Sequence, residues 1–400
     1  MESTNLPTEL SKPAPSIARG LVLLAFAAML GLCGLCASLF YLIIPFTARP
    51  NVESNLLLGV VAGIGILFGA TLAWQSILVW RGREPGTMAR ALPPFGIFLG
   101  VFFVAVLAGV GVQNFKPTAT LPVVLGFPVL HFIAATTPVF AVIAYAARRL
   151  GKASSSRTAF FALTWGAFGA TTIAIVVEAF LGILFLALAV MVILAQPAGA
   201  AQLGRLQRVL ETVTRTNDFA LLTQWLANPF VIAGILFYFA LLVPLIEEAF
   251  KTLVLVPLNS PRTLAREAIL WGICAGAGFA LLENLFNGIT ANNDWGVVIL
   301  MRAGTATMHI ANGAWMGRGW YAALVERRWG QLVQAYGLCV VAHAVWNGAA
   351  LVMSGGALVL NASAAIVPAS VLVGAMATIL VILTVLALIS LVYLVRRFSV

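Results

Sequence analysis

Residues 229–258 read PFVIAGILFYFALLVPLIEEAFKTLVLVPL, an apolar run that is long enough to cross a membrane yet carries Glu247, Glu248 and Lys251. About 20 apolar residues suffice for a transmembrane helix. A charged side chain at the centre of such a helix costs roughly 2.5–3.5 kcal/mol on insertion scales, so it persists where it faces a partner or a hydrated cavity. This stretch therefore indicates both a membrane fold and a polar centre within it.

The rest of the chain has the same apolar character. Of its 400 residues, 62% are hydrophobic and 9% are charged, whereas soluble domains carry roughly 25% charged residues. We therefore expect an all-α, polytopic membrane protein with the lipid bilayer as a partner. The formal charge is +10, but the basic residues are scattered over short loops without interleaved aromatic residues, so we expect no nucleic acid.

Cys33, Cys36, Cys274 and Cys339 lie within apolar runs and are interpreted as small buried residues rather than disulfides.

Hydropathy predicts about ten transmembrane helices, of which the fifth and tenth are longer than one crossing needs. They are residues 21–45, 56–80, 92–115, 121–146, 159–195, 229–258, 268–290, 296–320, 331–353 and 360–395. With the N-terminus placed inside, 16 of the 23 Lys and Arg residues fall in inner segments and 5 in outer ones. The positive-inside rule then predicts that both termini are cytoplasmic.

This topology divides the chain into five parts. Prolines and hydroxyl residues indicate a disordered cytoplasmic tail, and one long outer connection contains LGRLQRVLETV, whose apolar spacing predicts an amphipathic surface helix. The parts are a tail (1–18), an N-terminal five-helix membrane region (19–195), the outer loop (196–228), a four-helix core (229–353) and a C-terminal transmembrane helix (354–400).

Polar residues recur in each helix of the predicted core. Besides Glu247 and Glu248 they are Glu283 with Asn284 and Asn287, His309 with Asn312, and His343 with Asn347. Counted from the predicted cytoplasmic ends, Glu247, Glu283, His309 and His343 lie at a depth of roughly 16–23 Å. We therefore expect their side chains to meet in one layer near the middle of the bilayer.

Three further features bear on how this core packs. Adjacent Glu247 and Glu248 point about 100° apart on a helix, so one is expected to face the centre and the other a neighbour or Lys251. Gly272, Gly276 and Ala280 form a small face that lets another helix approach closely. Pro244 is expected to kink its helix, and His131, which has no acidic residue in its span, is interpreted as structural.

Four segments of the core carry motifs of a known family. They are EExxK at Glu247, Glu248 and Lys251; FxxxEN at Phe279, Glu283 and Asn284; the segment around His309; and HxxWN at His343, Trp346 and Asn347. The chain resembles, over roughly 235–353, the PrsW intramembrane proteases. The wider group also contains the CAAX-processing prenyl endopeptidases and the APH-1 subunit of γ-secretase.

The resemblance implies hydrolysis of a peptide bond of a membrane-protein substrate, such as an anti-sigma factor, in a bacterial inner membrane. Hydrolysis needs an activated water, an acid for the leaving amine and donors for the oxyanion. We assign Glu247 as general base and His309 to the water, with His343 and Asn347 as oxyanion donors. Glu248 and Glu283 would hold this arrangement or exchange roles with Glu247, because the sequence does not rank the three carboxyls.

Other interpretations use the same residues. His309, His343, Glu247 and Glu283 could instead hold Zn²⁺ with an open position, although the chain lacks an HExxH motif. Intramembrane Glu and His also occur in proton- or ion-coupled transporters, and a catalytically silent scaffold would retain a similar fold. We expect the substrate to be a single-pass membrane protein, and the sequence assigns neither an oligomeric state nor a role to residues 1–200.

Overall fold

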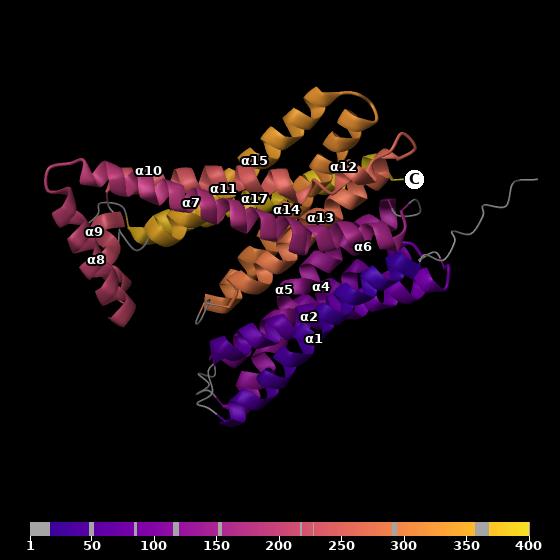
Figure 1. Cartoon of the computed structure of the whole chain (residues 1–400), viewed down its shortest axis with the longest axis horizontal. Coiled ribbons are helices and arrows are strands. Elements are labelled where there is room, and N and C mark those ends of the chain that lie inside the picture. The colour runs from indigo at the N-terminus through magenta and orange to yellow at the C-terminus, as the bar shows by residue number, and fades with distance from the viewer. Residues whose placement is uncertain are drawn as a thin grey trace, which may run out of the picture.

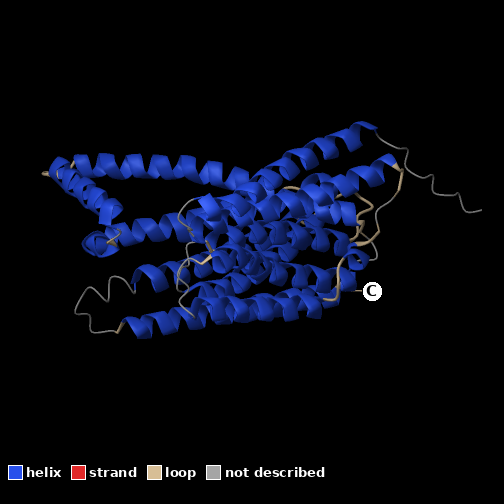
Figure 2. Cartoon of the chain, turned by 90° about the horizontal axis from the view of Figure 1, so that it is seen from below, coloured by secondary structure: helices blue, strands red, loops and turns tan. Residues whose placement is uncertain are grey.

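The protein is a bundle of long helices that run side by side (Figures 1 and 2). The computed structural model describes residues 17–47, 52–83, 86–114, 120–150, 154–216, 218–226, 228–289, 294–356 and 368–399. This described part contains helices and loops but no regular strand, which confirms the predicted all-α fold. Residues 1–16 of the predicted tail lie outside it.

Ten helical segments of the described chain traverse the bundle. They are α1 (Ile17–Thr47), α2 (Val52–Trp80), α4 (Phe95–Asn114), α5 (Leu121–Leu150), α6–η1–α7 (Ser156–Thr164, Trp165–Ala170, Thr171–Leu194), α10–η3–α11–α12 (Pro229–Ile235, Leu236–Leu242, Val243–Lys251, Leu255–Leu258), α13 (Ala265–Asn287), α14 (Trp295–Leu324), α15–η5 (Trp329–Leu351, Val352–Gly356) and α17 (Ala369–Arg397). Shorter elements are α3 (Met88–Ala91), α8 (Gly199–Thr216), η2 (Phe219–Leu222) and α9 (Thr223–Leu226).

Nine of these segments in the described part are long and apolar enough to cross a membrane, and α14 is the exception. Arg302, His309, Asn312 and Arg318 make α14 too polar, although it coincides with the eighth predicted span. Its 30 residues extend about 45 Å, more than the ~30 Å of a hydrocarbon core. It packs between α13 and α15, so neighbouring helices shield its polar residues from lipid.

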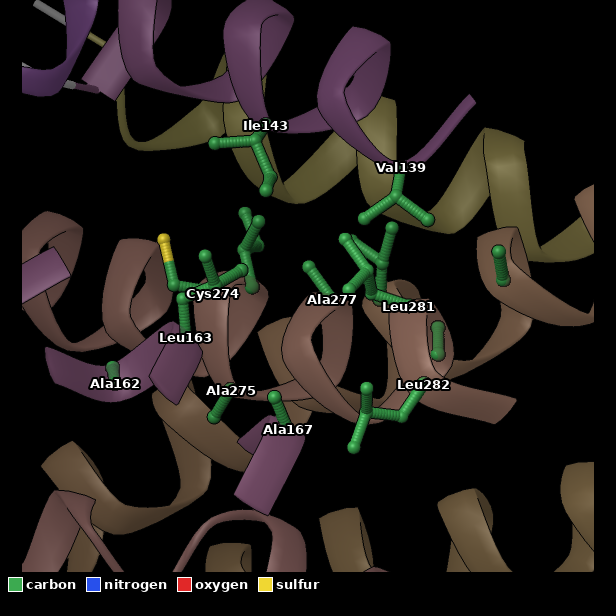
Figure 3. Packing of buried hydrophobic residues seen from close by; sticks show 14 of the residues in the cluster. Val139, Ile143, Ala162, Leu163, Ala167, Cys274, Ala275, Ala277, Leu281 and Leu282 are labelled. Atoms are coloured by element: carbon green, nitrogen blue, oxygen red, sulfur yellow. The ribbon is translucent and has the colours of Figure 1, made fainter. Parts of the chain in front are cut away.

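Helix α13 forms the centre of the bundle. In its most apolar stretch 89% of the residues are buried, compared with 22% in α17. Figure 3 shows α13 residues such as Ala277 and Leu281 packing against Val139 of α5. Leu163 of α6 contacts the opposite side, where a Cβ on Gly278 would lie 1.9 Å from its carbonyl oxygen. Within this enclosure the carboxylate of Glu283 on α13 is only 26% exposed.

The predicted small face of α13 meets α14. A Cβ atom on Gly272 would lie 2.1 Å from the carbonyl oxygen of Gly313, and one on Gly276 would lie 2.3 Å from that of His309. Only glycine tolerates this approach, which replaces side-chain packing by backbone contact. The contact holds the backbone of His309 against α13, in reach of the side chain of Glu283.

The helix that carries Glu247 is interrupted. Residues Leu236–Leu242 form a π-helical segment, in which Val243 N–H bonds to Tyr238 O, before α11 begins. Pro244 follows at the start of α11 and cannot donate a backbone hydrogen bond. Because π segments are frequent at functional sites, the break next to Pro244 is consistent with a functional site on this helix.

Two of the four cysteines, which lie on the N-terminal helix α1, are exposed and not buried as expected. Helices α1 and α2 form a hairpin in which a Cβ on Gly34 would lie 2.9 Å from the backbone of Gly65. Cys33 and Cys36 beside it are free and exposed, whereas Cys274 and Cys339 are free and buried. The interpretation as buried residues was therefore wrong for the first pair, because the backbones of Gly34 and Gly31 approach α2 whereas Cys33 and Cys36 lie on an exposed side of α1.

The connection at 196–228 forms an arm at one end of the bundle. Figure 1 shows α8 and α9 at the far ends of α7 and α10, away from the crowded centre. The predicted amphipathic helix is α8, and its Val213 is buried whereas Arg205 and Arg208 are exposed. Its position on the outer membrane surface stays a prediction.

Candidate active site

Five of the six predicted site residues meet in one cluster. Glu247 and Glu248 come from α11, Glu283 from α13, His309 from α14 and His343 from α15. The rings of His309 and His343 cross nearly at right angles with their centroids 4.8 Å apart. Side chains from four consecutive helices thus converge, as the depth calculation predicts.

Lys251 lies at the centre of this cluster and is completely buried. Its Nζ atom lies 3.2 Å from Glu247 Oε2, 2.9 Å from Glu248 Oε1 and 2.9 Å from His309 Nδ1. Phe279 covers the ammonium group, with 4.1 Å from Nζ to the ring centroid. All three ammonium protons therefore have acceptors, and the lysine joins α11 to α14.

Each histidine contacts a carboxylate through one ring nitrogen. An ammonium can only donate, so Nδ1 of His309 accepts from Lys251. Nε2 of His309 then carries the hydrogen that it donates to Glu283 Oε2, at 2.7 Å. His343 contacts Glu248 Oε1 through Nδ1 at 2.8 Å, which leaves its Nε2 atom 3.6 Å from Glu247 Oε2. The two carboxylates thereby fix the orientation of both rings.

Glu247 and Glu248 both reach His343, although they diverge from adjacent positions on α11. Their side chains approach opposite nitrogens of one imidazole ring, which bridges the angle between them. The expectation that only one of them faces the centre was therefore wrong. The physical reason is that the ring of His343 lies between the two directions in which the glutamates point.

Accessibility distinguishes the three carboxylates. The side chain of Glu248 is 1% exposed, that of Glu247 is 12% exposed and that of Glu283 is 26% exposed. Glu283 is nevertheless engaged, since Arg302 Nη2 lies 2.9 Å from the same oxygen that contacts His309. Glu247 is thus partly exposed, and its shortest ion-pair distance is 3.2 Å, to Lys251.

Arg302 is a residue that the sequence interpretation left unassigned. It also donates from Nε to Asn284 Oδ1 at 3.2 Å, so it holds both polar residues of the FxxxEN motif. A signal for this role is present in the sequence, because Arg302 lies seven residues before His309 and hence on the same face of the helix.

Asn347 is the predicted site residue that the structure does not bring into the cluster. Its side-chain amide donates to the carbonyl oxygen of Phe239 at 3.0 Å. In the π segment Val243 N–H bonds to Tyr238 O, so the next bond of this pattern would join residue 244 to Phe239 O. Pro244 has no N–H, and Asn347 supplies the missing donor. Its contact stabilises the helix break instead of facing the carboxylates.

Glu178 on α7 is a further acidic residue near the cluster. Val177 and Leu181, which flank it on α7, pack with Ile246 and Phe279. Its Oε1 atom is buried and has no hydrogen-bond partner within the described part of the chain. An acidic residue in the middle of the span 159–195 was the available signal, and the sequence interpretation missed it.

His131 lies outside the cluster, as predicted. Its Nε2 atom lies 2.9 Å from Leu285 O, and Trp295 Nε1 donates to its Nδ1 atom over the same distance. Both ring nitrogens are used to join α5, α13 and α14. This confirms the structural interpretation of His131.

The donor set for a metal ion differs from the predicted one. Donor atoms of Glu247, His309 and His343 lie within 4.8 Å of one another, and two imidazoles with a carboxylate suit zinc. Glu283 contacts Nε2 of His309 and Glu248 contacts Nδ1 of His343. In zinc sites a carboxylate commonly contacts the ring nitrogen that does not bind the metal, and it thereby orients the histidine. Glu283 itself is taken by Arg302 and His309. The chemistry therefore fits a divalent cation, but Lys251 must first withdraw from His309 and Glu247.

Comparison with known proteins agrees with the motifs. A family model described as "PrsW family intramembrane metalloprotease" matches residues 154–386, which include α6 to α15 and most of α17. No curated protein and no solved structure matches the chain. The matched region contains the whole cluster and more than half of the sequence, so the chain belongs to the PrsW family of intramembrane proteases.

Proposed function

We propose that the protein is an intramembrane endopeptidase in which Glu247 activates a water molecule for attack on a peptide bond. The observation that carries this proposal is the meeting of Glu247, Lys251 and His343 with two further carboxylates inside a helix bundle. A general base must come within hydrogen-bond reach of the water that it deprotonates. Among the three carboxylates, Glu247 alone is both partly exposed and loosely held.

The reaction follows from the positions of these groups. Glu247 takes a proton from water as the water oxygen bonds to the carbonyl carbon of the substrate. The carbonyl oxygen becomes an oxyanion, and the ammonium of Lys251 beside Glu247 is the nearest full positive charge that can stabilise it. The C–N bond then breaks, and the proton held by Glu247 passes to the leaving amine.

His343 and Glu248 have supporting roles in this proposal. Glu248 fixes the ring of His343 through Nδ1, so that Nε2 is directed to the same side as Glu247. An imidazole nitrogen in that position can share the attacking water with the carboxylate. His309 is bonded at both nitrogens, and we therefore assign it to holding Lys251 and Glu283 in place.

Glu178 is assigned to the substrate. A peptide bond inside a membrane becomes accessible only when its helix unwinds, and each freed N–H group then needs an acceptor. The unpartnered carboxylate oxygen of Glu178 lies on the helix that packs beside Ile246, next to the proposed base. It would accept a hydrogen bond from the substrate main chain near the cleaved bond.

A metal-dependent variant uses the same donors. If a zinc ion binds, Glu247, His309 and His343 would hold it, and it would supply Lewis acidity and an activated water. In the proposed mechanism Lys251 keeps its contacts with Glu247 and His309, and no ion is required. Activity should therefore survive treatment with a strong chelator, and elemental analysis of the active protein should show much less than one metal ion per chain.

We further propose a single-pass membrane protein as substrate, such as an anti-sigma factor, and a bacterial inner membrane as location. The test compares the membrane proteome of cells that produce the wild type, Glu247→Gln or Glu211→Gln. Glu211 is exposed on α8 and serves as the matched control. New fragment termini should depend on Glu247 and persist in the control. Identical fragments in all three strains would refute the proposal, and proton flux without new fragments would favour a transporter.

A further inference from the structure

A second concave site lies on the opposite side of α14 from the glutamate cluster. It is a cavity of about 1000 Å³ between α4, α5, α14, α15 and α17. Its walls are almost wholly apolar, and Arg396 is the one charged residue among the described residues that line it. Val381 and Leu388 of its wall are 63% and 48% exposed, so the cavity opens toward the surrounding lipid. We propose that it binds an anionic phospholipid, with an acyl chain in the cavity and the phosphate on Arg396.

The shape of the cavity favours an acyl chain over a helix. Its wall runs along α17 from Val373 to Arg396, about 35 Å at the rise of an α-helix, which is more than the ~30 Å hydrocarbon core. A volume of about 1000 Å³ over that length leaves a cross-section on the order of 30 Å², far below that of a helix roughly 10 Å wide. A long cavity of this volume therefore favours an extended hydrocarbon chain over a whole helix.

The positive charge of Arg396 at one end of the cavity favours a lipid with an anionic headgroup. Arg396 also lines a smaller cavity with Arg397, and the two cavities share Leu388 and Val392. Within the described residues neither arginine takes part in an ion pair with an acidic side chain, and Arg397 donates to the hydroxyl of Tyr393. An uncompensated guanidinium at the end of an apolar channel is suited to a lipid phosphate, which it can bind through two parallel hydrogen bonds.

The cavity contacts the two helices that carry the histidines. Thr307 of α14 and Trp346 of α15 line it, and they lie two and three residues from His309 and His343. Bound lipid would thus fill the space behind both helices. The site nevertheless does not depend on proteolysis, and its ligand can be measured directly.

The test uses native mass spectrometry of the full-length protein after delipidation in detergent. Phosphatidylglycerol and phosphatidylcholine with identical acyl chains are added to the wild type, to Arg396→Gln and to Arg149→Gln. Arg149 is an exposed arginine at the end of α5 that does not line the cavity, so it controls for a general loss of charge. We expect the wild type and Arg149→Gln to prefer phosphatidylglycerol by roughly five-fold, the factor for about 1 kcal/mol per basic residue, and Arg396→Gln to lose this preference.

Two further experiments distinguish binding of the acyl chain from binding of the headgroup. Val381→Trp fills the cavity from its exposed side and should reduce the binding of both lipids, while the melting temperature stays close to that of the wild type. Inorganic phosphate at the same concentration should not displace bound phosphatidylglycerol, because it lacks the acyl chain. Equal binding of the two lipids to the wild type, or the same preference in Arg396→Gln and Arg149→Gln, would overturn the proposal.

Discussion

Lys251 balances the negative charge of the two adjacent glutamates on α11 inside the bundle. It is completely buried and contacts Glu247, Glu248 and His309. A buried charge that loses its partner destabilises a protein by about 3–5 kcal/mol, because the remaining charge keeps its desolvation cost. The proposed base is therefore positioned by an ion pair whose removal affects folding as well as chemistry.

Replacing this lysine should lower stability strongly. We expect Lys251→Met to decrease the melting temperature in detergent far more than Arg328→Met, since Arg328 is 66% exposed and exposed ion pairs contribute only about 0–1 kcal/mol. The added substitution Glu248→Gln should restore part of the loss by removing one unpaired charge. Equal melting temperatures for the two methionine variants would contradict this account of the network.

Residue-level chemistry could be predicted from the sequence only in part. The carboxylates and imidazoles were found because a polar group in an apolar span is costly and therefore conspicuous. Their ranking was not accessible, because it depends on the exposures of Glu247 and Glu248 and on the contact of Arg302 with Glu283. Glu178 was missed because it lies on α7, outside the motifs of the core.

At the scale of elements, the break between η3 and α11 links α15 to the helix of the proposed base. Asn347 was predicted as an oxyanion donor because it lies four residues after His343. Its actual partner, Phe239 O, could not be predicted, because hydropathy does not reveal the π segment that leaves this carbonyl without a donor. Tyr336 makes a second contact of this kind, from its hydroxyl to Leu245 O at 2.7 Å.

The role of Asn347 can be tested with a double-mutant cycle. Asn347→Ala should cost roughly 0.6–1.7 kcal/mol, the range for hydrogen bonds between membrane helices. In a Pro244→Ala background the backbone regains its N–H group, so the same substitution should cost close to nothing. Unfolding of the four proteins in detergent measures the coupling. Additive losses would contradict the assignment of Asn347 to the helix break.

The glycine contact between α13 and α14 gives another prediction at this scale. A Cβ atom on Gly313 would lie 2.2 Å from Gly272 O, so Gly313→Ala must push the helices apart and separate His309 from Glu283. We expect a lower melting temperature and at least a ten-fold loss of proteolysis, since small displacements of catalytic groups have large effects. Gly337→Ala, where a Cβ would contact nothing within 4 Å, is the control and should retain both properties.

At the scale of the whole molecule, the number of crossings decides the topology. Hydropathy selects nine spans in the described chain, and we expect α14 to be the tenth because neighbouring helices bury its polar residues. An even number places both termini on one side, and Figure 1 shows the start of α1 and the end of α17 at the same end of the bundle. The sequence predicted this arrangement from the distribution of Lys and Arg.

Labelling with a membrane-impermeant thiol reagent would test the topology. In a protein with Cys33 and Cys36 replaced by serine, we expect Ser11→Cys and Ser399→Cys to react in inverted vesicles and Arg208→Cys in right-side-out vesicles. Reaction of Ser11→Cys and Ser399→Cys from opposite sides would mean an odd number of crossings. In that case α14 would not span the membrane.

The central claim is that Glu247 delivers a water oxygen to a peptide bond within the helix bundle. The most direct measurement is cleavage of a reconstituted single-pass substrate in ¹⁸O-enriched water, with the fragments analysed by mass spectrometry. The account predicts one ¹⁸O atom in the new carboxyl terminus for the wild type and for Glu211→Gln. It predicts a loss of cleavage of about 10²–10⁴-fold for Glu247→Gln, in a protein that stays folded because Lys251 keeps its ion pair with Glu248. Cleavage by Glu247→Gln at the wild-type rate would contradict it.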